Sequence, residues 1–140
     1  MQHNLILKIV TKFLVPIILL FAFYVQFHGD YSPGGGFQAG VIFSSAALLY
    51  ALVFGMDATT KVFSDVVLIR IACLGVLLYA QTGVVSLLKG GEFLNYNLLA
   101  EQPVSGQHIG IIVIEFGVGM TVASIMLLIF FTFARRISSQ

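Results

Sequence analysis

Charged residues and cysteine are both scarce in this sequence. Charged side chains make up 9% of the 140 residues, whereas a soluble globular domain carries about 25%. Hydrophobic residues make up 59%, and the mean hydropathy is +1.01. So few charges cannot cover a soluble surface of this size, and we predict an all-α integral membrane protein. The single cysteine, Cys73, excludes an internal disulfide and is expected to be a small buried hydrophobic residue.

Several classes of function are excluded by groups that the sequence does not contain. A net charge of +1, with no basic cluster beyond Arg135 and Arg136, excludes nucleic acid as a partner. No His, Cys, Asp or Glu spacing matches a metal site. The glycines at 34–36 lack the lysine and hydroxyl residue of a phosphate loop. Since no nucleophile–base pair and no soluble domain are evident, we expect neither an enzyme nor a bound cofactor.

Four apolar segments are each close to the roughly 20 residues that a membrane-spanning helix needs. They run from about 5 to 27, 37 to 56, 66 to 88 and 109 to 133. We therefore predict four transmembrane helices in a single domain that covers residues 1–140. Ser64 is expected to cap the third helix, with Asp65 favourable in its first turn.

Lysine and arginine are unevenly placed along the chain. Six of the seven lie near the two ends or near the second connection: Lys8, Lys12, Lys61, Arg70, Arg135 and Arg136. The positive-inside rule then places both termini and the 57–64 connection in the cytoplasm. The first connection and the 90–107 connection would face outward, and Lys89 alone argues the other way.

The second apolar segment carries small residues at a helical spacing. They step by three or four positions and so share one narrow face of a helix: Gly36, Gly40, Ser44, Ala47, Ala51 and Gly55. Such a face lets another backbone approach closely, because no large side chain intervenes. We therefore expect this helix to pack against a partner helix, which could belong to this chain or to another.

Residues 27–40 are the longest departure from apolar sequence in the first half of the chain. Three consecutive glycines there indicate a tight backbone path against another element, since a solvated loop does not need them. One interpretation is a rigid turn that docks on another subunit, formed by Pro33, Gly34, Gly35, Gly36, Phe37 and Gly40. The alternative is an aqueous vestibule for cations, lined by His28, Asp30 and Gln38. Asp30 is expected near the positive start of the second helix, with His28 as its partner.

One ionisable side chain lies deep in a predicted helix. Glu115 follows His108 by seven residues, which is about 10 Å along a helix and places both residues on one face. A glutamate at that depth must be protonated, paired or next to water, because a lone charge is costly there. Two interpretations stay open: a proton or cation contact with His108 alongside, or a structural hydrogen bond from a neutral Glu115 to a neighbouring helix.

Two strings of residues resemble a known family. The first is His-Gly-Asp at 28–30 followed by Pro-Gly-Gly-Gly-Phe-Gln-Ala-Gly at 33–40, and the second runs from His-Ile-Gly-Ile at 108–111 through Glu-Phe-Gly-Val-Gly at 115–119. Both look like the MnhB (or MrpB) component of the Mrp cation/proton antiporter, an assembly also called Mnh or Pha. The chain length and the four apolar segments are similar too, so the resemblance covers essentially the whole chain.

The resemblance implies an assembly in the bacterial inner membrane that exchanges cytoplasmic Na+, or another monovalent cation, for external protons. It also implies other membrane subunits as partners, the larger of which would carry the main proton channels. The residues agree with an accessory role, because a route across about 30 Å of hydrocarbon needs several polar groups and this chain offers one deep carboxylate. Two alternatives are a similar module of a hydrogenase or other redox complex coupled to ion movement, and a purely structural scaffold.

Overall fold

The computed structural model describes residues 2–30 and 33–138, and within them it contains helices and no strand. Four of the helices are long: α1 (Gln2–His28), α2 (Gly36–Phe54), α4 (Asp65–Leu88) and α5 (Pro103–Ser138). Two short helices lie in the connections: α3 (Met56–Thr60) and the 3-10 helix η1 (Tyr96–Leu98). Each long helix has the length and composition to cross a membrane, which confirms the predicted all-α membrane fold.

Several helix boundaries differ from the predicted ones: α1 begins earlier, at Gln2, and α5 ends later, at Ser138. Two further differences have a local reason. α2 ends at Phe54, short of the expected Met56, because Gly55 adopts a φ of 94° and separates α2 from α3. α5 begins at Pro103, earlier than the expected Ile109. Proline is tolerated in the first turn of a helix, where its missing N–H has no partner to lose. With 36 residues, α5 is about 54 Å long and exceeds the thickness of a hydrocarbon core.

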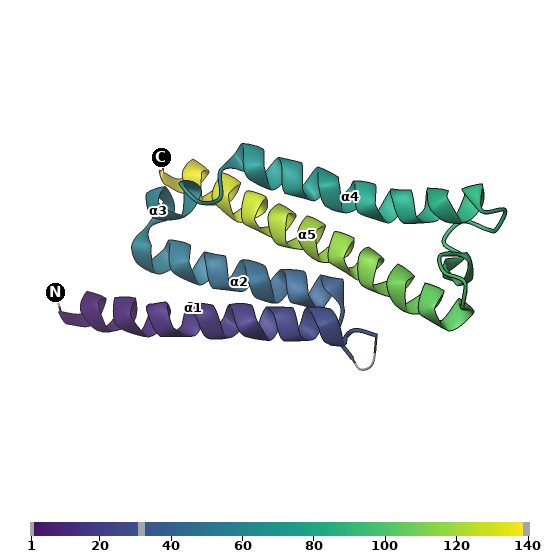
Figure 1. Cartoon of the computed structure of the whole chain (residues 1–140). Helices are drawn as coiled ribbons and strands as arrows, with labels where there is room; N and C mark the ends of the chain where they lie inside the picture. Colours follow the sequence, from purple (N-terminus) through teal and green to yellow (C-terminus); the bar gives the residue numbers. More distant parts are fainter. Residues whose placement is uncertain (1, 31–32, 139–140) are drawn as a thin grey trace.

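The four long helices lie side by side in one row (Figure 1). α1 packs on α2, α2 packs on α5, and α5 packs on α4, so the last helix of the chain is inserted between α2 and α4. The two outer helices, α1 and α4, expose many large apolar side chains. In a membrane, such a layer leaves both of its faces to lipid or to other proteins.

Small residues form the contact between α2 and α5. The members of the predicted small-residue face that belong to α2 are all buried: Gly36, Gly40, Ser44, Ala47 and Ala51. A side chain on Gly40 would lie 2.8 Å from the carbonyl oxygen of Gly119, so the two backbones are nearly in contact. The expected partner helix is therefore α5 of the same chain. Gly55 is not part of this contact, because it lies outside α2 with open space beside it.

A second close contact joins α4 to α5. Gly75 faces the backbone of α5, where a side chain would collide with the Thr121 hydroxyl and the carbonyl of Gly117. The Thr121 hydroxyl donates a hydrogen bond to the carbonyl of Ala72 at 3.3 Å, as well as to Gly117 in its own helix at 2.9 Å. Cys73, which we expected to be buried, is exposed instead, because the neighbouring Ala72 and Gly75 occupy the face of α4 that meets α5.

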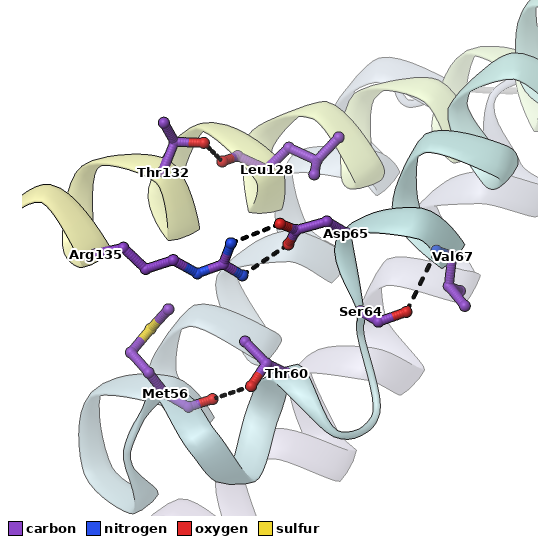
Figure 2. Close-up of polar contacts among 8 residues, drawn as sticks. All are labelled: Met56, Thr60, Ser64, Asp65, Val67, Leu128, Thr132 and Arg135. Atoms are coloured by element: carbon purple, nitrogen blue, oxygen red, sulfur yellow. Dashed lines mark hydrogen bonds and ion pairs between the residues drawn. The ribbon is translucent and has the colours of Figure 1, made fainter.

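The helix ends near α3 hold the largest buried side chains. They also hold an ion pair, which Figure 2 shows. Phe131, Leu68 and Leu127 are almost fully buried there. The Arg135 guanidinium donates two hydrogen bonds to the Asp65 carboxylate, at 2.5 and 2.7 Å, and so ties the end of α5 to the start of α4. Ser64 caps α4 as predicted, because its hydroxyl accepts the Val67 N–H at 3.4 Å.

Both termini and α3 lie at one end of the long helices, and the α1–α2 and α4–α5 connections lie at the opposite end (Figure 1). Lys89, the one basic residue that argued against the predicted orientation, lies at the end that holds the two connections. Its ammonium group donates hydrogen bonds to the carbonyls of Leu98 and Leu99, at 2.8 and 3.3 Å. This residue therefore holds the α4–α5 connection together, which explains its place away from the other basic residues.

We expect Gly75→Leu to destabilise the protein by about 1–3 kcal/mol, the usual cost of forcing a larger side chain into a packed contact. The added side chain would push α4 away from α5. Ala80→Leu is the matched control, because Ala80 is exposed on the same helix. The measurement is the apparent melting temperature of the detergent-solubilised protein. An equal loss in both variants would contradict a close α4–α5 contact.

Candidate functional site

The α1–α2 connection ends beside the middle of α5 instead of at its start. Gly29, Gly35 and Gly36 all lie against Glu115. Residues 103–114 of α5, which make up about 18 Å of helix, precede this level. Figure 1 shows α4 and α5 running past the α1–α2 connection at this end. The α4–α5 pair therefore extends beyond the α1–α2 connection at this end.

Glycine is required where the connection meets Glu115. A side chain on Gly29 would lie 2.5 Å from one carboxylate oxygen of Glu115, and a side chain on Gly35 would lie 2.9 Å from the other. A side chain on Gly36 would collide with the Glu115 backbone. Gly35 also has a φ of 114°, which other residues rarely adopt. The tight path predicted from the glycine triplet therefore follows α5 of the same chain.

Asp30 and His108 close the same site. The His108 ring nitrogen Nδ1 contacts the Asp30 carboxylate across 78 residues of sequence. The Asp30 side chain is 10% exposed and that of His108 is 43% exposed. The sequence suggested His28 as the partner of Asp30. In the structure the His28 ring stacks on the Tyr24 ring, with 4.6 Å between the ring centroids. The carboxylates of Asp30 and Glu115 are near enough to interact electrostatically. We call Asp30, His108, Glu115, Gly29 and Gly35 the glycine-loop site.

The remaining residues of the predicted motif divide between two surfaces. Gly40 is buried against α5, whereas Pro33, Phe37 and Gln38 are exposed. The Phe37 side chain is 64% exposed. Gly34 lies over the end of α1, where a side chain would come within 3.0 Å of the Val25 carbonyl. The glycines thus serve the fold of this chain, while the larger side chains point away from it.

Sequence reasoning missed one polar residue near this site. Gln26 of α1 reaches α5, where its Oε1 would lie 2.6 Å from a side chain placed on Gly119. The signal was present in the sequence, since Gln26 is an amide inside an apolar segment. It was hidden because the spacing within one helix does not tell which neighbour that helix will meet.

The α4–α5 connection folds against the first turns of α5. The Tyr96 ring packs where Gly110 has no side chain, and the Gln107 amide donates a hydrogen bond to Asn97 at 2.9 Å. Burial, together with the neighbouring Tyr79 phenol, raises the pKa of Tyr96 above its usual value near 10. Tyr96 therefore stays neutral at physiological pH and acts as a packing group.

The chemistry available at the glycine-loop site is proton exchange and weak cation contact. Within the described residues, no group of three or more His, Cys, Asp and Glu side chains lies close enough to hold a metal ion. The Glu115 side chain is half-buried, and its carboxyl is close enough to Asp30 for the two groups to interact electrostatically. A half-buried carboxyl in this setting can take up or release a proton.

The fold and the site define a multi-pass membrane protein in which a glycine-rich connection packs against a carboxylate of α5. A family described as "Domain related to MnhB subunit of Na+/H+ antiporter" matches residues 6–128. Proteins from the Newman and JH1 strains of Staphylococcus aureus, each named "Putative antiporter subunit mnhB2", are 34% identical over 129 residues. The matches cover 89% of this chain and 90% of each relative. The chain belongs to the MnhB family.

We expect Asp30→His and His108→Asp each to lower stability by about 1–2 kcal/mol, because each change places two like groups side by side. The double variant restores an Asp–His pair in the opposite sense. It should therefore recover most of the loss. Apparent melting temperatures of the solubilised protein measure this effect. If the double variant is no more stable than the less stable of the two single variants, the result would argue against the Asp30–His108 contact.

Proposed function

We propose that this chain is an accessory membrane subunit of a multisubunit Na+/H+ antiporter. The observation that carries the proposal is the family match over residues 6–128, which includes both the glycine-rich connection and Glu115. The relatives that match along nearly the whole chain carry an antiporter subunit name. The chain is therefore a component of a transporter, with other membrane subunits as its partners and Na+ and H+ as the ions that the whole complex exchanges.

The proposed orientation places both termini in the cytoplasm of a bacterial cell, with the chain in the inner membrane. This orientation is supported by the basic residues at the helix ends where the two termini lie. Lys89 at the opposite end is held by backbone carbonyls, so its position reflects the fold of the α4–α5 connection. The glycine-loop site then opens toward the outside, from which the protons would arrive.

Glu115 is the proposed proton contact of this subunit. Its carboxyl is half-buried beside the Asp30–His108 pair. It lies at the level where the α1–α2 connection ends and α5 extends beyond it. A proton could pass between these groups, or a cation could pause beside the two carboxylates. Gln38 is exposed near the same connection and His28 lies at the end of α1, so both stay in the proposed vestibule.

We predict that Glu115→Gln lowers Na+/H+ exchange by about tenfold or more, because the amide keeps the shape but cannot carry a proton. The intact complex should still assemble. The measurement is Na+-dependent collapse of a pH gradient in membrane vesicles, together with the yield of the purified complex.

Glu101→Gln is the matched control, since Glu101 is exposed in the α4–α5 connection. Loss of assembly in Glu115→Gln would assign a structural role to the carboxyl. Unchanged assembly with unchanged exchange would remove Glu115 from the path.

The exposed part of the glycine-rich connection is the proposed docking loop. Phe37 presents a large apolar ring, and Pro33 restricts the backbone that leads to it. Gly34, Gly35 and Gly36 fix the loop against its own chain, so the Pro33 and Phe37 side chains are held outward. A preordered surface of this kind loses little entropy when it meets another subunit.

We predict that Pro33→Gly reduces the yield of the assembled complex more than it changes the Na+ dependence of exchange. Glycine adds backbone freedom at a position with an exposed side chain. Quantitative purification and the Na+ concentration for half-maximal exchange measure the two effects. Normal yield with altered Na+ dependence would contradict a docking role.

A further inference from the structure

The contact between Asp30 and His108 joins the residues that follow α1 to the second turn of α5. Asp30 lies just beyond the end of α1, and α1 itself packs on α2 with little contact to α5. The Gly35 N–H donates a hydrogen bond to the Val25 carbonyl at 3.3 Å, so the start of α2 is held to α1 without α5. The Asp30–His108 contact is therefore a separate link, between the end of α1 and α5.

This link also holds backbone over the Glu115 carboxyl. Gly29 directly precedes Asp30, and a side chain on Gly29 would collide with both carboxylate oxygens of Glu115. The Asp30 side chain is largely buried, whereas the His108 side chain is partly exposed and can exchange protons with the solution. Access to Glu115 from this side therefore depends on whether the contact keeps Gly29 in place.

Carboxyl groups from two segments lie beside His108. Asp30 contacts its ring, and Glu115 lies two turns further along α5, near enough to Asp30 to interact electrostatically. Among the described residues, the other titratable groups at this end of the helices are His28, Tyr79, Lys89, Glu92, Tyr96 and Glu101. The Lys89 ammonium is bonded to backbone carbonyls and Tyr96 stays neutral at physiological pH, so neither replaces His108 as the partner of Asp30.

We propose that the Asp30–His108 contact is a pH-dependent restraint, which covers Glu115 when His108 is protonated and uncovers it when His108 is neutral. Imidazole is the side-chain group that changes its charge between about pH 5 and 8. A protonated His108 adds the attraction between opposite charges to the hydrogen bond with Asp30, and a neutral His108 loses that attraction. The contact is therefore strongest at low pH and weakens as the pH rises through this range.

The proposed orientation gives this restraint a role in the complex. The two connections then face outward, so the covering of Glu115 responds to the external pH. Low external pH keeps the carboxyl covered, and higher external pH opens it to the solution. This consequence rests on the proposed function, whereas the restraint itself can be measured on the purified chain.

Hydrogen–deuterium exchange of the purified chain in detergent tests the restraint at the amides of Gly29 and Asp30, with rates corrected for the intrinsic pH dependence of exchange. We expect the protection of these amides to fall by about threefold to fivefold between pH 6 and pH 8, the effect of losing one partly exposed ion pair. Amides in the first turns of α4, at the opposite end of the helices, should show no such change.

Three variants identify the group that titrates. His108→Gln cannot take up a proton and should show the low protection at both pH values. His108→Lys stays charged and should keep at pH 8 the protection that the parent has at pH 6. His28→Gln is the matched control and should retain the pH dependence, because the His28 ring stacks on Tyr24. A parent without pH dependence, a dependence that survives in His108→Gln, or low protection of His108→Lys at pH 8 would overturn the proposal.

The outcomes also separate this restraint from the proposed function. If the unmodified chain purifies without any other antiporter subunit, the proposed function fails, and the protection measurement still decides the restraint. If the complex exchanges Na+ for H+ but Gly29 and Asp30 show no pH-dependent protection, only the restraint fails.

Discussion

The close contact between α5 and the glycine-rich start of α2 is the constraint on which the rest of the structure depends. Gly36 and Gly40 bring the α2 backbone against Glu115 and Gly119. This contact seats α5 between α2 and α4, although α5 comes last in the chain. Side chains at these glycines would force the helices apart, and the packed contact would be lost.

The same contact places the polar groups. With Gly29 and Gly35 against it, the Glu115 carboxyl lies at the end of the α1–α2 pair instead of within a helix interface. His108, two turns earlier in α5, then meets Asp30. Gln26 reaches α5 one turn beyond Glu115, at Gly119. One backbone approach therefore brings residues from three separate segments into a single site.

Much of the fold could be predicted from the sequence, because apolar length and small-residue spacing are local signals. The four helices, the Ser64 cap and the buried face of α2 follow from such signals. The sequence could also indicate that the glycine triplet follows another element, and that Glu115 and His108 share a face. It could not indicate that these two predictions concern the same place, because helix order in the row depends on contacts between distant segments. For that reason the sequence could not predict the Asp30–His108 contact or the contact of Gln26 with α5.

The distribution of polar groups argues for a supporting role within a larger conduit. Titratable side chains gather at one end in the glycine-loop site, and Asp65 and Arg135 are paired at the other end. Between the two ends lies an apolar cavity whose described lining has only Ser124 and Gln26 as polar residues. A proton or cation that reached Glu115 would meet no continuous polar path through the described part of this chain, and crossing an apolar gap alone is costly. Groups from a neighbouring subunit are therefore needed to continue any route.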